Sequence, residues 1–309
     1  MKKIFILILI ITGILFLGIF ASATDNPVEI GMIVKSVNSE FWQNMLDGGK
    51  QFDEENENVT VTAYGPESET DIERAITILE NVVTSGPDAI VVASQSGEGA
   101  IPAVTTAMEQ GIPVITADTV IPTDVVSHLA TDNVAGGKIA AETMVEVLEE
   151  NGIEKKGTVV IVHVVVCDTD TKRGEGFDER LSELAPDINV VHSNYTDDEV
   201  VKAMTLTEDV VTTYDDLIGL FGIDYNIGEG IALAIEQAGL QDDVMVVAFD
   251  DSEAEINALK KGVIKALIVQ DPYNMGYKGC EFAVRTLNGE EVPKYFDTGV
   301  KVLKKEDVE

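Results

Sequence analysis

Apolar runs of strand length recur along the chain and alternate with segments of helical periodicity. Most of these runs are apolar at every position, which is typical of strands covered by helices on both faces. The alternation predicts parallel sheets built from repeated strand-helix-strand units. Ten strands are expected near Val28 to Val34, Val59 to Tyr64, Ala89 to Ala93, Pro113 to Ala117, Val126 to Leu129, Thr158 to Val166, Asn189 to His192, Leu217 to Gly222, Val244 to Phe249 and Ala266 to Val269.

The segments between these strands carry the apolar stripes of amphipathic helices. Two examples are Ile72, Ala75, Ile76, Leu79, Val82 and Val83, and then Val200, Val201, Met204, Leu206 and Val210. Helix caps are expected at Ser39, Ser68 and Ser252, and helix stops at Gly111 and Gly239. Ten strands are divided most economically into two sheets of about five, with the chain crossing between them near residues 131–133.

The first residues have the pattern of an export signal. Met1 and two lysines lead into an apolar run from Ile4 to Phe20, and Ala21-Ser22-Ala23 follows as a small-residue cleavage site. We expect cleavage after Ala23 and a periplasmic or other extracytoplasmic location. Because the apolar run is long for a signal peptide, an uncleaved anchor is the alternative.

Composition and charge narrow the possible partners. The chain has 309 residues, 45% of them hydrophobic, and a formal net charge of −34. Such a charge excludes nucleic acid and anionic membrane surfaces as partners. Cys167 and Cys280 lie far apart and are expected to be free, buried thiols. The three histidines lack metal-ligand spacing and are expected to be structural: His128, His163 and His192.

Polar and aromatic side chains follow the carboxyl ends of the predicted strands, where open parallel sheets bind ligands. The predicted binding residues are Lys35, Ser39, Phe41, Trp42, Asp118, Arg173, Asp224, Phe249, Asp250 and Gln270. Charged groups strengthen hydrogen bonds to hydroxyls, and aromatic rings cover the C–H faces of sugars. This set of side chains therefore suits a polyhydroxylated ligand.

Each of these residues also has a plainer interpretation. Phe41 and Trp42 could anchor the first helix in the core, although the neighbouring Lys35 favours a binding site. Asp118 and Asp250 could cap the helices that follow them. Arg173 could lie on the surface of a helix, and Asp224 could begin a turn. Gln270 could satisfy local backbone groups.

Seven segments, in their order and spacing, carry a resemblance to a known family. They are KSVNSEFW from Lys35, GIPVITAD from Gly111, SHLATDNVAGGKIA from Ser127, RGEGF from Arg173, VMVVAFD from Val244, VQDPYNMGYKG from Val269 and DTGV from Asp297. Together they resemble type I periplasmic binding proteins of the ribose, allose and galactose group, the receptor components of bacterial ABC sugar importers. The resemblance covers Pro27 to Glu309.

The resemblance implies an α/β fold of two Rossmann-like lobes with parallel sheets, joined by a three-segment hinge. The crossings are expected near Thr131, Gln270 and Asp297. The implied division is a signal peptide at 1–23, an N-terminal lobe at 24–131 plus 271–297, and a C-terminal lobe at 132–270 plus 298–309. The ligand is expected to be clamped between the lobes.

The resemblance also implies roles for single residues. Trp42 would stack on the sugar ring, with Phe41 lining the other side. Polar contacts are implied for Asp118, Arg173, Asp250 and Gln270. Lys35 replaces a serine of the ribose-binding pattern and Asp224 an asparagine, which disfavours ribose, whereas a lysine with a Phe-Trp pair resembles the allose-binding pattern.

These observations predict a monomeric, non-enzymatic receptor for a neutral monosaccharide or polyol, without cofactor or metal, whose lobes close on the ligand. Its expected partners are the permease subunits of an ABC importer, with a chemoreceptor as a further candidate. One alternative is a sensor for a sugar or autoinducer. Another is an exported hydrolase using Asp118 and Asp250 as paired carboxylates. No nucleophile elbow or phosphate loop in the sequence supports an enzyme.

Overall fold

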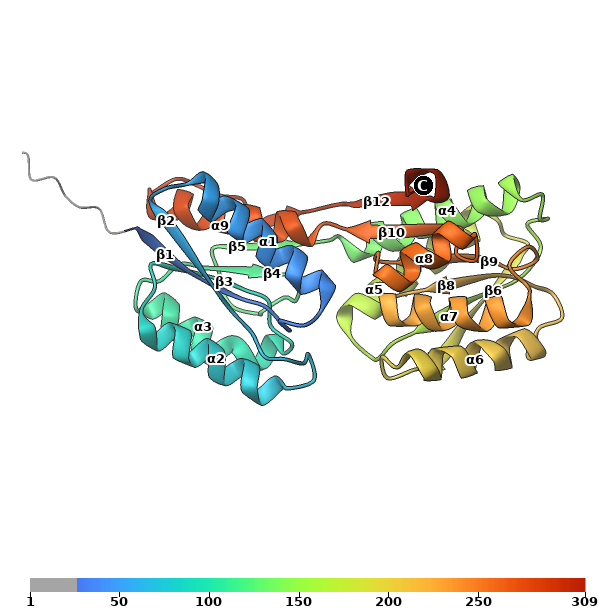
Figure 1. Ribbon diagram of the computed structural model, residues 1–309, viewed down its shortest axis with the longest axis horizontal. Helices are drawn as coiled ribbons and strands as arrows, with labels where there is room; N and C mark the ends of the chain where they lie inside the picture. The colour runs from blue at the N-terminus through green and yellow to red at the C-terminus, as the bar shows by residue number, and fades with distance from the viewer. Residues whose placement is uncertain (1–26, 309) are drawn as a thin grey trace, which may run out of the picture.

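The computed structural model describes residues 27–308, which form two α/β lobes lying side by side (Figure 1). The expected signal peptide lies outside the described residues. The first lobe contains β1 (Val28–Ile33), α1 (Glu40–Glu55), β2 (Val59–Tyr64), α2 (Ile72–Ser85), β3 (Ala89–Val92), α3 (Gly97–Glu109), β4 (Val114–Ala117), β5 (Ser127–Ala130), α9 (Pro272–Leu287) and β11 (Tyr295–Asp297).

The second lobe is built from the middle of the chain and its last strand. It contains α4 (Asn133–Glu150), β6 (Gly157–His163), α5 (Asp168–Leu184), β7 (Ile188–Tyr195), α6 (Val200–Thr213), β8 (Leu217–Gly222), α7 (Tyr225–Ala238), β9 (Met245–Phe249), α8 (Glu253–Lys261), β10 (Ala266–Gln270) and β12 (Val300–Lys304), followed by the 3₁₀ turn η1 (Lys305–Asp307).

Each lobe is centred on one six-stranded sheet, and the two sheets have the same strand order. The orders are β11-β5-β4-β3-β1-β2 and β12-β10-β9-β8-β6-β7. All pairings are parallel except that of β10 with β12, which is antiparallel. The predicted parallel sheets are confirmed. The predicted number of five strands per sheet is one too low, because β11 and β12 were not expected. In both sheets the strand order reverses beside the first strand of the lobe, which is where α/β sheets bind ligands.

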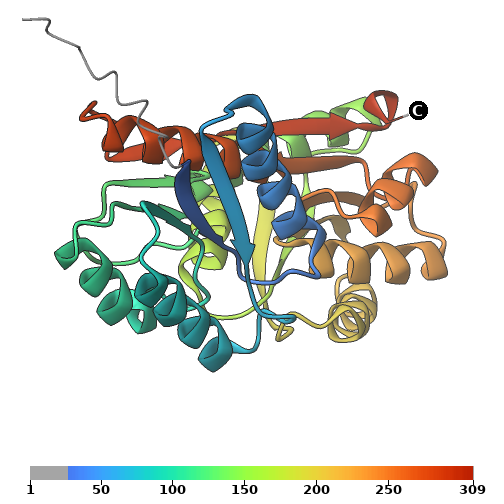
Figure 2. The same cartoon turned by 60° about the vertical axis from the view of Figure 1, so that its left-hand side comes forward.

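Helices cover both faces of each sheet, which explains the continuously apolar strands. In the first lobe, α1 and α9 lie on one face and α2 and α3 on the other (Figures 1 and 2). Trp42, Met45 and Met275 belong to the core under the first pair of helices. Leu79 and Val104 belong to the core under the second pair. Each large apolar side chain that is fully buried stabilises the fold by about 1.5–3 kcal/mol.

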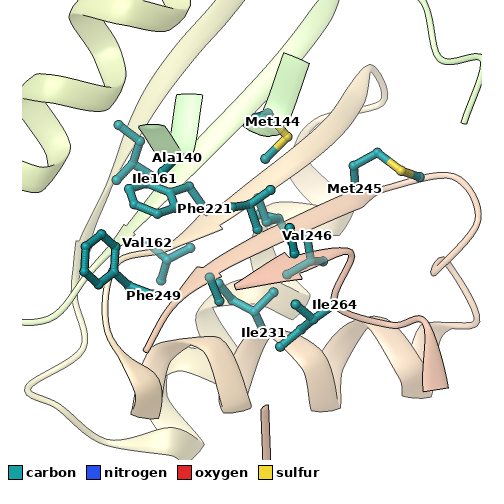
Figure 3. Packing of buried hydrophobic residues seen from close by; sticks show 14 of the residues in the cluster. Ala140, Met144, Ile161, Val162, Phe221, Ile231, Met245, Val246, Phe249 and Ile264 are labelled. Atoms are coloured by element: carbon teal, nitrogen blue, oxygen red, sulfur yellow. The ribbon is translucent and has the colours of Figure 1, made fainter. Parts of the chain in front are cut away.

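The second lobe has one continuous core around β6, β8, β9 and β10. Met245, Val246 and Phe221 project from neighbouring strands into this core (Figure 3). The rings of Phe177 and Phe221 stack with their centroids 4.4 Å apart. Because Phe177 belongs to α5, this contact fixes that helix on the sheet and so positions the residues at its amino-terminal end.

The chain passes between the two sheets three times: from β5 to α4, from β10 to α9 and from β11 to β12. Asp297 ties two of these crossings together, because its Oδ1 accepts the backbone N–H groups of Asp132 at 3.0 Å and Gly299 at 2.8 Å. A hinge of three short connecting segments permits rotation of the lobes while limiting other movements. The residue boundaries of the two lobes stay a prediction.

The structure corrects the expected end of the sixth strand. The strand β6 ends at His163 rather than Val166, and Val166 is 79% exposed. As a result the neighbouring Cys167 is exposed, so the prediction of a buried thiol at that position was wrong. Cys280 lies buried in α9, as expected, and both thiols are free. A valine-rich run signals apolar character but does not show where a strand leaves its sheet.

Four of the five predicted helix boundaries are confirmed and one was wrong. Ser39 stands at the N-cap of α1, although its side chain makes no capping hydrogen bond, and Gly111 follows the end of α3 in the left-handed conformation. Ser252 forms a capping box with Glu255 at the start of α8, and Gly239 ends α7 in the left-handed conformation. Asp71, not Ser68, caps α2 by accepting the backbone N–H of Arg74 at 3.1 Å. Asp71 follows Ser68 so closely that either residue satisfies the sequence rule for a cap.

Candidate functional site

A cavity of about 550 Å³ lies between the two lobes. Its walls come from the segments after β1 and β2 and the start of α1 in the first lobe. In the second lobe they come from the loops after β7 and β9 and from the starts of α7 and α8. Three of the predicted binding residues line it: Ser39, Phe41 and Asp250. The volume is within the range of small-molecule sites.

Lys35 and Asp118 form an ion pair on the first-lobe side of the cleft. Lys35 follows β1, Asp118 follows β4, and Lys35 Nζ lies 2.6 Å from Asp118 Oδ2, with both side chains largely covered. Burial opposes ionisation of Asp118, but the charge and hydrogen bond of Lys35, helped by the charge of Arg173, hold its pKa below the ordinary value. The aspartate is therefore an anion at neutral pH and does not cap a helix.

Asp118 and Asp250 occupy equivalent positions in the two lobes. Each directly follows the fourth strand of its lobe, and each has a left-handed backbone, with φ of 61° and 77°. Such a backbone is uncommon for residues other than glycine, although aspartate adopts it more readily than most, and residues that have it cluster at functional sites. The backbone N–H of each residue is held by the next strand, through Leu129 O at 2.8 Å and Ile268 O at 2.9 Å.

Trp42 is packed into the first lobe next to this ion pair. It is only 3% exposed, and the ring centroid of Phe41 lies 4.7 Å from that of Trp42 in an edge-to-face arrangement. Lys35 Nζ lies 5.1 Å from the centre of the Trp42 ring, and the indole N–H donates to Glu69 Oε1 at 2.6 Å. The packing of the aromatic pair in the core, which was the plainer interpretation, is thus present. A sugar can reach the face of Trp42 only if a group that covers it moves.

Arg173 lies on the second-lobe side and is 5% exposed, so it is not a helix-surface residue. Its Nε donates to Asn133 Oδ1 at 2.8 Å and its Nη1 donates to the carbonyl of Ile223 at 2.9 Å. The guanidinium carbon lies 3.8 Å from the centre of the Phe249 ring. These three contacts fix the guanidinium plane at the carboxyl ends of β6, β8 and β9.

Asp250 and Gln270 form a second polar pair on this side. Gln270 Nε2 donates to Asp250 Oδ1 at 2.7 Å, and both residues are 6% exposed. Burial raises the pKa of Asp250 against the charge of Arg173 and the hydrogen bond from Gln270. Gln270 therefore binds an aspartate that lines the cavity, and not only its local backbone.

Asp224 has a structural role and also faces other carboxyl groups. It caps α7 by accepting the backbone N–H of Asn226 at 3.1 Å. Burial raises the pKa of Asp224 well above its ordinary value, and the charges of Asp250 and Asp198 add to this rise. The charge of Arg173 opposes it. Burial also raises the pKa of Asp198. Carboxyl oxygens accept hydrogen bonds, which suits the hydroxyls of a ligand.

A buried polar network supports the start of α5, the helix that carries Arg173. Asp170 Oδ1 lies 2.6 Å from His163 Nδ1, and Asp170 Oδ2 accepts the backbone N–H of Val164 at 2.8 Å. His163 Nε2 lies 2.9 Å from His192 Nδ1. These contacts agree with the structural role expected for both histidines.

The sequence interpretation missed several residues that contribute to the site. Asn133 orients Arg173, and Glu69 binds the indole of Trp42. Tyr225 and Asn226 line the cavity beside Asp198. Glu69 lies in a polar loop without a motif, so no signal in the sequence could have selected it. Asn133 stands in the quoted SHLATDNVAGGKIA segment and could have been found through its position after the crossing.

Residues 27–308 contain neither a candidate metal site nor a candidate membrane span. No group of three or more His, Cys, Asp or Glu side chains in this part of the chain is arranged to hold a metal ion. None of its helices has the length and apolarity required to cross a membrane.

Comparison with known families gives one extensive match. Residues 30–291 match the model of a periplasmic binding protein domain. This range includes all but the last strands of the two sheets, β11 and β12, and it contains every predicted binding residue.

Individual relatives cover almost the whole chain. The ribose import binding protein RbsB of Salmonella typhimurium is 29% identical over 281 residues, which is 90% of each protein. A carbohydrate transporter solute-binding protein from Agrobacterium radiobacter, solved with D-arabinose, is 31% identical with a TM-score of 0.82, covering 91% of this chain and 95% of that one. A solute-binding protein from Agrobacterium vitis with bound D-fucose is 32% identical with a TM-score of 0.79, covering 91% and 97%.

Proposed function

This chain belongs to the family of periplasmic binding proteins, and on that premise we propose that it is the extracytoplasmic receptor of an ABC sugar importer. It binds a neutral monosaccharide or polyol between its lobes and delivers it to the permease. Relatives named for ribose import, or solved with D-arabinose and D-fucose, support a sugar as the ligand class. The periplasmic location follows the family, and export through residues 1–23 is part of the proposal.

The observation that carries this proposal is the pair of matching half-sites. Asp118 and Asp250 directly follow the equivalent strands β4 and β9, and each is paired: Asp118 with Lys35 and Asp250 with Gln270. Both aspartates have the left-handed backbone that marks functional positions. A ligand held between them contacts both lobes, so its binding energy favours the closed arrangement over an open one. Docking on permease subunits, and a chemoreceptor as further partner, stay predictions.

The charges of the site support a ligand without a negative charge. Lys35 is paired with Asp118, and Arg173 faces Asp224 and Asp250. Neither cation is therefore free to neutralise a carboxylate or phosphate of a ligand. The carboxyl groups are instead suited to the hydroxyls of a neutral sugar.

Thermal unfolding in the presence of candidate ligands tests the function. The panel contains D-ribose, D-arabinose, D-fucose, D-allose, D-galactose and xylitol, with D-glucuronate as the anionic comparison. A ligand at 1,000 times its Kd stabilises the folded protein by about 4.1 kcal/mol, which raises the melting temperature by several degrees. We expect at least one neutral compound to do so and D-glucuronate to have no effect. No response to any neutral compound, or chemical conversion of the bound sugar, contradicts the proposal.

Asp250→Ala tests the second-lobe half-site. Because Asp250 is a buried acceptor, its loss should weaken binding of the sugar found above by about 1.5–3 kcal/mol, or roughly 10- to 150-fold in Kd measured by calorimetry. Asp243→Ala is the matched control, since Asp243 is exposed and precedes the same strand at its other end. Wild-type affinity in Asp250→Ala would remove this residue from the site.

A further inference from the structure

Glu69 is a half-buried acid of the cleft that the binding pattern in the sequence does not include. It lies in the loop between β2 and α2 and lines the cavity between the lobes. Its Oε1 accepts the indole N–H of Trp42 at 2.6 Å. The chain contains a single tryptophan, so this contact involves the only indole in the protein.

The contact restricts the orientation of the Trp42 ring. Trp42 is 3% exposed, and a buried indole N–H without an acceptor costs about 1–3 kcal/mol. Phe41 meets the ring at an interplanar angle of 74°, and Lys35 lies over its face. Neither neighbour can accept the indole proton, so Glu69 alone among these contacts selects one rotation of the ring.

Glu69 also faces the opposite lobe. Burial raises its pKa, and the charges of Asp118 and of Asp198 add to this rise, against the charge of Lys35 and the hydrogen bond from Trp42. Asp198 belongs to the second lobe. The charge of Glu69 in turn helps to raise the pKa of Tyr225, which begins α7 of that lobe. Glu69 lines the same cavity as Asp198 and Tyr225, so it lies where the two lobes face each other.

We propose that Glu69 is a specificity-determining residue of the binding site, which positions the Trp42 ring with one carboxylate oxygen and accepts a ligand hydroxyl at the cavity. The inference rests on the proposed function and deepens it. Glu69 selects ligands that present a hydrogen-bond donor to it while a C–H face meets Phe41, the ring of the aromatic pair that lines the cavity. A ligand with an acceptor or an anion at that position is rejected, because it would face the carboxylate.

The fluorescence of Trp42 tests the positioning without any ligand. Emission of the ligand-free protein should change with pH, with a midpoint above about 4.3, the ordinary pKa of glutamate. In Glu69→Gln this transition should be absent. Asp118, the acid that pairs with the Lys35 lying over Trp42, has a lowered pKa and so titrates in a different range. Glu73→Gln is the matched control, because Glu73 is an exposed glutamate at the start of the neighbouring helix α2.

Calorimetry tests the ligand contact, using the sugar with the largest thermal shift in the panel above. At pH 7, Glu69→Gln should weaken binding of this sugar roughly 10- to 100-fold. In the parent protein the affinity should fall as the pH falls through the titration of Glu69. In Glu69→Gln this fall should be absent. Unchanged emission and unchanged affinity in Glu69→Gln overturn the inference. If no sugar binds the parent protein, the proposed function and the ligand contact fail together, while the emission titration still decides the Trp42 contact.

Discussion

Arg173→Met is expected to destabilise the protein by about 3–5 kcal/mol and to abolish sugar binding. The buried guanidinium satisfies Asn133 Oδ1 and the carbonyl of Ile223, and its charge opposes the raised pKa values of Asp224 and Asp250. Methionine fills part of the volume but leaves these groups without a partner. Chemical denaturation measures the change in stability, and calorimetry measures the loss of affinity.

The effect of Arg173→Met should depend on pH in a definite direction. Asp224 and Asp250 have raised pKa values in the folded protein, and loss of the cation raises them further. As the pH falls, both take up protons and the penalty of an unpaired buried charge disappears. The difference in stability from the parent should therefore be smaller in acid than at neutral pH. A difference that grows as the pH falls would contradict this account.

Arg180→Met is the matched control for this experiment. Arg180 lies two turns further along the same helix and pairs with Glu142 and Glu183 on the surface. Its replacement should leave the denaturation midpoint and the affinity almost unchanged, because exposed ion pairs contribute little. If Arg173→Met fails to fold, Arg173→Lys retains the charge and still tests the loss of the fixed guanidinium contacts. Wild-type stability and affinity in either Arg173 variant would disprove its role.

Gly276→Ala is expected to destabilise the first lobe by about 1–3 kcal/mol or more, because it forces two helices apart. The helices α1 and α9 cross at a point where each presents a glycine to the backbone of the other. A Cβ atom at Gly276 would overlap the carbonyl oxygen of Met45, and one at Gly48 would overlap that of Tyr273. Neither overlap can be relieved by a side-chain movement. Denaturation followed by circular dichroism measures the cost.

The double variant Gly48→Ala/Gly276→Ala provides a sharper test. Both substitutions are accommodated by the same separation of α1 and α9, so the second should cost less than the first. Asp47→Ala is the control in α1, since Asp47 is exposed and immediately precedes Gly48. Two outcomes would contradict the close contact of α1 and α9 as the cause. One is that the losses of stability from the two glycine substitutions add strictly, and the other is that either loss equals that of Asp47→Ala.

The strands could be predicted where their apolar runs were continuous, because burial on both faces leaves a signal in the sequence itself. The two missed strands, β11 and β12, have mostly exposed or half-buried residues. They are strands because β5 and β10 offer free edges for pairing. Their neighbours, rather than their own composition, determine their conformation.

The site was predictable in part, because polar groups after apolar strands indicate which ends of a sheet bind ligands. Lys35 and Asp118 could both be selected in this way, but their pairing across 83 positions of the chain could not. Glu69 and Asn133 serve the site through contacts with Trp42 and Arg173. Such contacts depend on the relative orientation of separate loops.

By itself the sequence determined the α/β class, the parallel sheets and the set of polar strand ends, since each depends on local periodicity and on the direction of parallel strands. Only the tertiary structure decided which of these groups are paired, which are buried and which line the cavity. The physical reason is that charge pairing and burial depend on distances between residues far apart in the chain. The cleft brings two lobes of the same strand order face to face, and that arrangement leaves no trace in any single segment.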